Sequence, residues 1–353
     1  METAYRYLPA SERLGWQLVP SLSERMEDYF KAPAEPNDLT LLALGDSFTE
    51  FQDQSGGNYI RYAEAQINLE TRKINAFNLS EAGTDVDRYQ SVFCAATTQR
   101  KPDIAVFGIY IGNDVKGFQR PIKNIDCTIP TTNSELNLRA WLKKSLILNA
   151  TFRLAKIYLP WARSNFYENT KAYLTKNMSP TEVAMAEARI PKEMVKLAKS
   201  DAINPWDVAI ALVDPSLYRS LAEPKGTPIA ENYNALADEI IILNQQCEQT
   251  DIKCLFVVIP VAPWVSHRAQ QYFIQLTYDV FGLEIAYPVG LQNFLSKLSS
   301  SGVPTLDLLP ALRRAAISES LFIAKDIHFN QKGQQVAGNA LAKKMHELGW
   351  LRD

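Results

Sequence analysis

The sequence lacks the features that mark several large classes of protein. It has only four cysteines and three histidines in 353 residues, without any Cys-x-x-Cys pair, which argues against a zinc site. It has no run of 18 or more apolar residues, which argues against a transmembrane helix. Its formal net charge of −2 creates no overall field that would attract nucleic acid or an anionic membrane. We therefore expect a globular protein with no metal, no organic cofactor and no nucleic-acid partner.

The compartment and the oligomeric state are not indicated by the sequence. The first seven residues lack the apolar core of a signal peptide, which fits a cytoplasmic protein. A bacterial protein of the periplasm would look the same once its leader had been trimmed. Cys247 and Cys254 flank a predicted turn from helix to strand, so they could pair. The alternative is that the four thiols are buried and unpaired.

Apolar runs separated by helical patterns predict a parallel sheet. Residues 40–44 are apolar without polar alternation, which is typical of a strand buried on both faces. Residues 104–110 and 254–260 are similar apolar runs, and residues 73–78 and 304–308 are expected to form two further, shorter strands. Because helical segments lie between these runs, we expect right-handed parallel crossovers and an α/β fold with five strands.

The regular alternation is interrupted over residues 120–230, which we interpret as a helical cap inserted into the main domain. The main domain then comprises residues 40–119 and 231–353, and residues 1–39 form an N-terminal arm. Four helices are expected in and after the interruption, at residues 136–159, 180–199, 205–221 and 231–247. The first has basic residues among apolar ones, so it could touch a membrane surface or pack on its own domain.

Ser47 lies just past the carboxyl end of the first strand, two residues after the turn residue Gly45. Ligands bind at the carboxyl ends of the strands in open α/β sheets, so a serine held there is a candidate nucleophile. The alternative is that Asp46 or Ser47 caps a helix that follows.

Gly83 and Asn113 follow two further strands and should reach the same edge of the sheet as Ser47. The backbone N–H groups of Ser47 and Gly83 and the side-chain amide of Asn113 could hold a developing oxyanion. Taken singly, Gly83 could be a turn glycine and Asn113 a turn or cap residue. Asp46 and Trp264 are candidates for substrate contact, with packing as the alternative for Trp264.

Asp326 and His328 are two residues apart, so in extended chain their side chains point the same way and can hydrogen-bond. A histidine can take a serine proton near neutral pH, and a carboxylate on its other nitrogen would fix its tautomer. The other histidines, His267 and His346, lack such a setting.

Four segments in order resemble the sequence blocks of the SGNH (GDSL-type) hydrolase superfamily. They are residues 45–50 (Gly-Asp-Ser-Phe-Thr-Glu), 78–83, 112–114 (Gly-Asn-Asp) and 326–328 (Asp-Ile-His). The commoner last block has two residues between Asp and His, and here there is one. Some bacterial members linked to polysaccharide O-acetylation resemble this shorter form.

The resemblance implies a flavodoxin-like, three-layer α/β/α fold and a serine esterase without a cofactor. Ser47, His328 and Asp326 would form a catalytic triad, and Gly83 and Asn113 would complete an oxyanion hole with the Ser47 N–H. The substrate would be a small-molecule or glycan ester, cleaved through an acyl-enzyme. A polysaccharide O-acetyltransferase would use the same residues, and a non-catalytic glycan-binding module is a third alternative.

Overall fold

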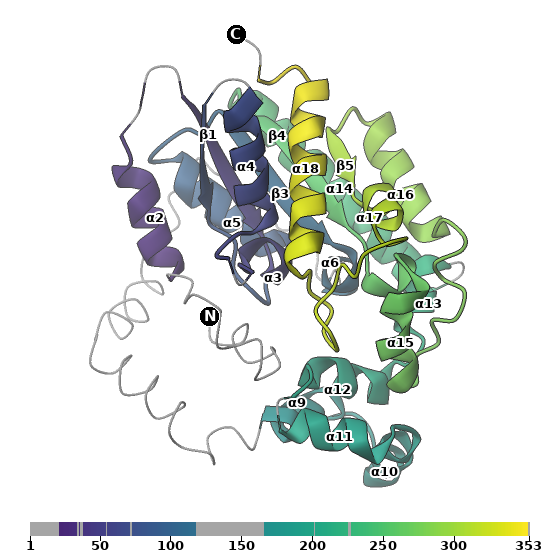
Figure 1. The fold of residues 1–353 in the computed structure, drawn as a ribbon. Helices are drawn as coiled ribbons and strands as arrows, with labels where there is room; N and C mark the ends of the chain where they lie inside the picture. Colours follow the sequence, from purple (N-terminus) through teal and green to yellow (C-terminus); the bar gives the residue numbers. More distant parts are fainter. Residues whose placement is uncertain are drawn as a thin grey trace, which may run out of the picture.

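The fold is organised around a sheet in which every strand pairs in parallel with its neighbours (Figure 1). The computed structural model describes residues 21–33, 35, 38–53, 55–70, 73–117, 166–200, 202–224 and 227–351. Within these ranges the strands are β1 Leu39–Gly45, β2 Ile74–Asn78, β3 Ile104–Tyr110, β4 Lys253–Ile259 and β5 Thr305–Asp307. Their order is β2-β1-β3-β4-β5, which confirms the predicted five-stranded parallel sheet.

This strand order places a crevice at the carboxyl ends of β1 and β3. The chain passes from β1 to β2 on one side, whereas β3 pairs with β1 on the other side. The connections that leave β1 and β3 therefore diverge, and such a switch point is where open α/β sheets bind ligands. The segments that carry Ser47 and Asn113 both leave the sheet here.

Helices cover both faces of the sheet (Figure 1). On one face, α4 (Tyr59–Glu70) lies beside α18 (Gln331–Glu347), and on the other lie α5 (Val86–Thr97) and α14 (Pro228–Gln249), with α16 (Val289–Ser300) packed against α14. The contact between α4 and α18 requires glycine at position 338, since a Cβ there would lie 2.7 Å from the carbonyl oxygen of Tyr59. The sheet itself is the core: all seven residues of β3 are buried.

Shorter helices surround the sheet at its edge and at the carboxyl ends of its strands. They are α2 Leu22–Lys31, α3 Ser47–Glu50, α6 Ile111–Gly117, α13 Leu217–Ala222, the 3-10 turn η3 Ala262–Trp264, α15 His267–Gln275 and α17 Leu309–Ala315. None of the helices in the described ranges is both long enough and apolar enough to cross a membrane.

Within residues 120–230, where the sequence predicts a helical cap, the structure describes α9 Phe166–Leu174, α10 Pro180–Arg189, α11 Lys192–Lys199 and α12 Pro205–Val213. The prediction of one helix over residues 180–199 is wrong, because Pro191 separates α10 from α11. The prediction of one helix over 205–221 is wrong for the same reason, because Pro215 separates α12 from α13. Proline lacks an N–H and pushes the residue before it out of the helical region, as at Ile190 (ψ 132°).

Helix α9 was not predicted. The predicted helix over 136–159, with its alternative membrane contact, lies outside the described residues, as do residues 1–20 of the predicted arm.

Cys247 and Cys254 form a disulfide that links the end of α14 to the start of β4, with the Cα atoms 6.1 Å apart. Cys94, on α5, is also disulfide-bonded. The alternative of unpaired thiols is therefore wrong for the three cysteines in the described part of the chain.

Candidate active site

Ser47 is the first residue of α3, immediately after β1 and the cap residue Asp46. Oδ1 of Asp46 accepts a hydrogen bond of 2.9 Å from the backbone N–H of Phe48, so Asp46 caps this helix. Gly45 allows the sharp turn, since a Cβ at this position would collide with the side chain of Thr49. The two interpretations of this stretch are therefore compatible, because Asp46 caps the helix and Ser47 is its first residue.

A continuous chain of hydrogen bonds connects Ser47, His328 and Asp326. Oγ of Ser47 lies 2.8 Å from Nε2 of His328, and Nδ1 of the same ring lies 2.5 Å from Oδ1 of Asp326. Oδ1 of Asp326 also accepts the backbone N–H of His328 at 2.9 Å. The aspartate therefore holds both the backbone and the ring of the histidine, with a single residue between them.

The chain turns sharply before this pair, and aromatic rings enclose the imidazole. Lys325 has a positive φ of 61°, which is unusual for a residue other than glycine and reverses the chain just before Asp326. The rings of Phe48 and Phe51 lie 4.9 and 4.5 Å from the His328 ring, centroid to centroid. His328 is only 4% exposed, so its orientation is set by packing as well as by hydrogen bonds.

Gly83 lies in the turn after β2, with a φ of 74° that favours glycine. This turn is attached to the Ser47 segment at two points. The N–H of Glu81 donates to the carbonyl of Gly45 at 2.9 Å, and the N–H of Ala82 donates to Oε2 of Glu50 at 2.8 Å.

Asn113, on α6 after β3, reaches the same segment from the other side of β1. Its Nδ2 donates to Oδ2 of Asp46 at 2.9 Å. The structure therefore brings Ser47, Gly83 and Asn113 to one edge of the sheet, as the topology predicted.

Asp46 and Asp114 are buried carboxyl groups whose charges interact at this edge of the sheet. Burial raises the pKa of Asp46 to about 6. The hydrogen bonds from Phe48 and Asn113 and the charge of His328 act in the opposite direction and lower this pKa, but burial is the larger effect. Burial raises the pKa of Asp114 well above its usual range, and the neighbouring charge of Asp46 raises it further. Asp114 accepts hydrogen bonds from the N–H of Tyr110 at 2.9 Å and from the hydroxyl of Tyr89 at 3.2 Å.

Asp207, on helix α12, is a further buried carboxyl group. Its Oδ2 accepts from the hydroxyl of Tyr272 at 3.1 Å, and its backbone carbonyl accepts from the hydroxyl of Tyr278 at 2.6 Å. These bonds fasten α12 to α15 and to the segment that follows it. Burial, and then the charge of Asp326, raises the pKa of Asp207 well above its usual range. No sequence pattern pointed to Asp207, because its position depends on how α12 packs against Tyr272 and Tyr278.

The two predicted substrate contacts lie below the surface. Asp46 is fully buried, and its two carboxylate oxygens accept hydrogen bonds from the N–H of Phe48 and the side-chain amide of Asn113. Trp264 is also fully buried, and its Nε1 donates to the carbonyl of Tyr218 at 3.2 Å. This placement favours the packing alternative for Trp264.

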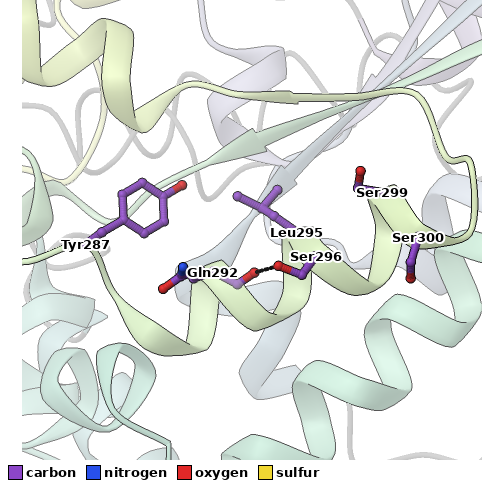
Figure 2. A pocket seen from close by; sticks show the side chains of 6 residues that line it. All are labelled: Tyr287, Gln292, Leu295, Ser296, Ser299 and Ser300. Carbon is purple, nitrogen blue, oxygen red and sulfur yellow. Dashed lines mark hydrogen bonds between the residues drawn. The ribbon is translucent and has the colours of Figure 1, made fainter.

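A hollow of about 620 Å³ lies elsewhere, along α16 (Figure 2). It is lined by Tyr287, Gln292, Leu295, Ser296, Ser299 and Ser300. It includes no carboxylate, histidine or cysteine, so we assign no chemistry to it. In the described ranges, no group of three or more His, Cys, Asp or Glu side chains is placed to hold a metal ion.

Among known proteins, residues 228–352 match the model of the family described as SGNH hydrolase-like domain, acetyltransferase AlgX. No curated protein matches the chain. Among solved structures, LAE5, an alpha/beta hydrolase enzyme from the metagenome of Lake Arreo, Spain, is 13% identical, with 89% of this chain and 97% of that chain covered and a TM-score of 0.41.

Two other similar structures are 10% identical to the chain. One is a putative lipolytic protein of the G-D-S-L family from Desulfitobacterium hafniense DCB-2, with 87% of this chain and 99% of that chain covered and a TM-score of 0.38. The other is Axe2, an acetylxylan esterase from Geobacillus stearothermophilus, with 89% of this chain and 97% of that chain covered and a TM-score of 0.38.

Proposed function

We propose that the chain is a serine esterase of the SGNH hydrolase superfamily, and that it hydrolyses carboxylic esters through an acyl-enzyme on Ser47. The observation that carries this proposal is the hydrogen-bonded chain from Ser47 through His328 to Asp326, with distances of 2.8 and 2.5 Å. Small acyl groups such as acetyl, on an alcohol or a carbohydrate, are the substrates we expect.

His328 acts first as a base and then as an acid. Asp326 accepts the Nδ1–H of the ring, which leaves Nε2 free to take the proton of Ser47 as Oγ attacks the ester carbonyl. The imidazolium then donates this proton to the leaving alcohol, and the acyl group remains on Oγ. Water, deprotonated by Nε2, releases the acid and restores the serine.

Three donors from separate segments would stabilise the oxyanion. The N–H of Ser47 is at the start of α3, the N–H of Gly83 is in the turn after β2, and the amide of Asn113 is on α6. Preorganised donors of this kind contribute the most where charge develops in the transition state.

A second candidate is transfer of the acetyl group to a sugar hydroxyl in place of water. It is favoured by the match of residues 228–352 to a family described as an acetyltransferase. The chemistry up to the acyl-enzyme is identical, so only the acceptor distinguishes the two reactions.

The test is hydrolysis of p-nitrophenyl acetate and butyrate by the wild type, by Ser47→Ala and by Ser296→Ala. Ser296 is a matched control, because it lies on α16 and its hydroxyl donates to the carbonyl of Gln292, four residues earlier on the same helix. We expect Ser47→Ala alone to lose turnover, and a fluorophosphonate to label Ser47 in the wild type. Turnover that survives in Ser47→Ala would overturn the proposal. Formation of an acetylated oligosaccharide at the expense of acetate would favour transfer.

We also propose that the protein works in an oxidising, extracytoplasmic compartment. The disulfide between Cys247 and Cys254 and the bonded state of Cys94 support this, since such bonds persist outside the reducing cytosol. Alkylation of free thiols in intact cells, followed by mass spectrometry, should find Cys247 and Cys254 protected. Labelling of both cysteines would contradict this location.

A further inference from the structure

The turn that carries Gly83 is held by a buried ion pair that the proposed chemistry does not use. Glu50, three residues after Ser47, is 5% exposed and is the last residue of α3. Its Oε2 accepts the N–H of Ala82 at 2.8 Å, and its Oε1 lies 2.8 Å from a guanidinium nitrogen of Arg25. Because Ala82 directly precedes Gly83, this bond holds the peptide unit next to the one that presents the Gly83 N–H.

Arg25 comes from helix α2, which precedes the sheet in the sequence. Besides its ion pair with Glu50, it donates to the carbonyl of Asn78 at 2.8 Å, at the start of the same turn. Its side chain is only 11% exposed, so the ion pair is shielded from solvent. The guanidinium of Arg25 thus links Glu50 to the beginning of the turn at Asn78. The carboxylate of Glu50 links the segment after Ser47 to the end of the same turn, at Ala82.

Burial raises the pKa of Glu50, and the charge of Arg25 opposes this shift. Burial in turn lowers the pKa of Arg25, opposed by the charges of Glu50 and Glu81. A buried pair of this kind adds little net stability compared with an apolar pair, but it fixes geometry because each charge needs its partner.

We propose that Glu50, held by Arg25, is a positioning residue that fixes the Gly83 N–H for the oxyanion. This inference rests on the proposed function and adds the group that orients one of its donors. Neither residue touches the reacting atoms. Their effect is on the placement of the donor, where a displacement of about 1 Å can cost about 100-fold in rate.

The test compares kcat and KM for p-nitrophenyl acetate in Glu50→Ala, Glu50→Gln and Arg100→Met. We expect Glu50→Ala to lower kcat by about 10- to 100-fold, with KM changed less than about two-fold, because the donor acts in the transition state. Glu50→Gln should recover part of this loss, since its amide oxygen can still accept from Ala82. A merely structural role would not produce this recovery with KM unchanged.

Arg100→Met is the matched control, because Arg100 fastens the other end of α2. It donates to the carbonyls of Tyr29 and Ala32 at 2.8 and 2.6 Å, and makes no hydrogen bond to the turn of Gly83. We expect its kcat to stay within about two-fold of the wild type. An equal loss in Arg100→Met, or no loss in a folded Glu50→Ala, would overturn the positioning role.

Hydrogen exchange provides a readout that does not need turnover. Peptides that cover residues 79–84 should exchange faster in Glu50→Ala than in the wild type or in Arg100→Met. If the wild type hydrolyses no ester, the proposed function fails, while this measurement still decides whether Glu50 orders the turn. Unchanged exchange in all three proteins would overturn the inference.

Discussion

Nδ2 of Asn113 donates a hydrogen bond of 2.9 Å to Oδ2 of Asp46, although 67 positions separate the two residues. An ionised carboxylate can only accept, so it selects the nitrogen of the amide and not its oxygen. One N–H of the amide is then held by Asp46, and the second remains for an oxyanion. Oδ1 of Asn113 is buried and has no hydrogen-bond partner in the described part of the chain.

Replacement of Asn113 by alanine should remove one oxyanion donor. We expect kcat for p-nitrophenyl acetate to fall by about 10²- to 10³-fold, with KM little changed, because the donor acts on the transition state. Circular dichroism and thermal melting should confirm that the variant is folded. Normal turnover in a folded Asn113→Ala variant would remove Asn113 from the proposed oxyanion hole.

The contribution of Asn113 should depend on the ionisation of Asp46. The pKa of Asp46 is raised to about 6 by burial, so at lower pH its carboxyl group is protonated and no longer selects the amide nitrogen. The ratio of kcat for wild type to kcat for Asn113→Ala should be largest above about pH 7 and shrink as the pH falls through about 6. A ratio that is constant from about pH 5 to pH 8 would contradict the mechanism.

Asp326 should be the carboxylate that orients His328 for catalysis, although only one residue separates the two. Asp326→Asn replaces the acceptor of the Nδ1–H by an amide, and we expect kcat to fall by about 10³- to 10⁴-fold. Asp207→Asn is the comparison, since Asp207 bonds to Tyr272 and not to the imidazole. Its kcat should stay within about three-fold of wild type. Equal losses in the two variants would mean that the histidine is not oriented by Asp326 alone.

Glu239 should make the free energy of unfolding depend on pH. It is 1% exposed on α14, its Oε2 has no hydrogen-bond partner among the described residues, and burial raises its pKa to about 7. The folded state then holds the proton more tightly than the unfolded state, whose pKa is near 4.5. Protonated Glu239 therefore stabilises the folded state at low pH, and this contribution to the free energy of unfolding is lost as the pH rises from about 4.5 to 7.

The Glu239→Gln variant should avoid this loss. We expect it to be more stable than wild type at about pH 8, on the order of 1 kcal/mol, and equal or less stable at about pH 4.5. Denaturant unfolding at the two pH values measures the difference. A gain that is the same at both would show that charge burial is not its cause.

The disulfide between Cys247 and Cys254 should stabilise the fold without affecting the site. It closes a short loop at the amino end of β4, whereas Ser47 lies at the carboxyl edge of the sheet. Loop closure over seven positions predicts a loss of about 2 to 3 kcal/mol in the Cys247→Ala/Cys254→Ala double variant. Denaturant unfolding measures this loss, and kcat should be unchanged. A large fall in kcat with little loss of stability would contradict this separation.

The sequence by itself determined the parallel sheet and the residues of the candidate site. Strands buried on both faces are recognisable because their apolar runs are local and continuous, as in residues 104–110. The parallel topology then requires the ends of β1, β2 and β3 to meet at one edge, so Ser47, Gly83 and Asn113 could be placed together in advance. Asp326 and His328 were predictable because they are only two residues apart.

Only the tertiary structure decided which distant groups support that site. The bond from Asn113 to Asp46 and the ion pair of Arg25 with Glu50 both join segments far apart in the sequence. Such contacts leave no periodic pattern, because each depends on how two elements pack. The sequence does not determine the disulfide for the same reason. The spacing of Cys247 and Cys254 permits a bond, but the bond depends on how the end of α14 packs beside the start of β4.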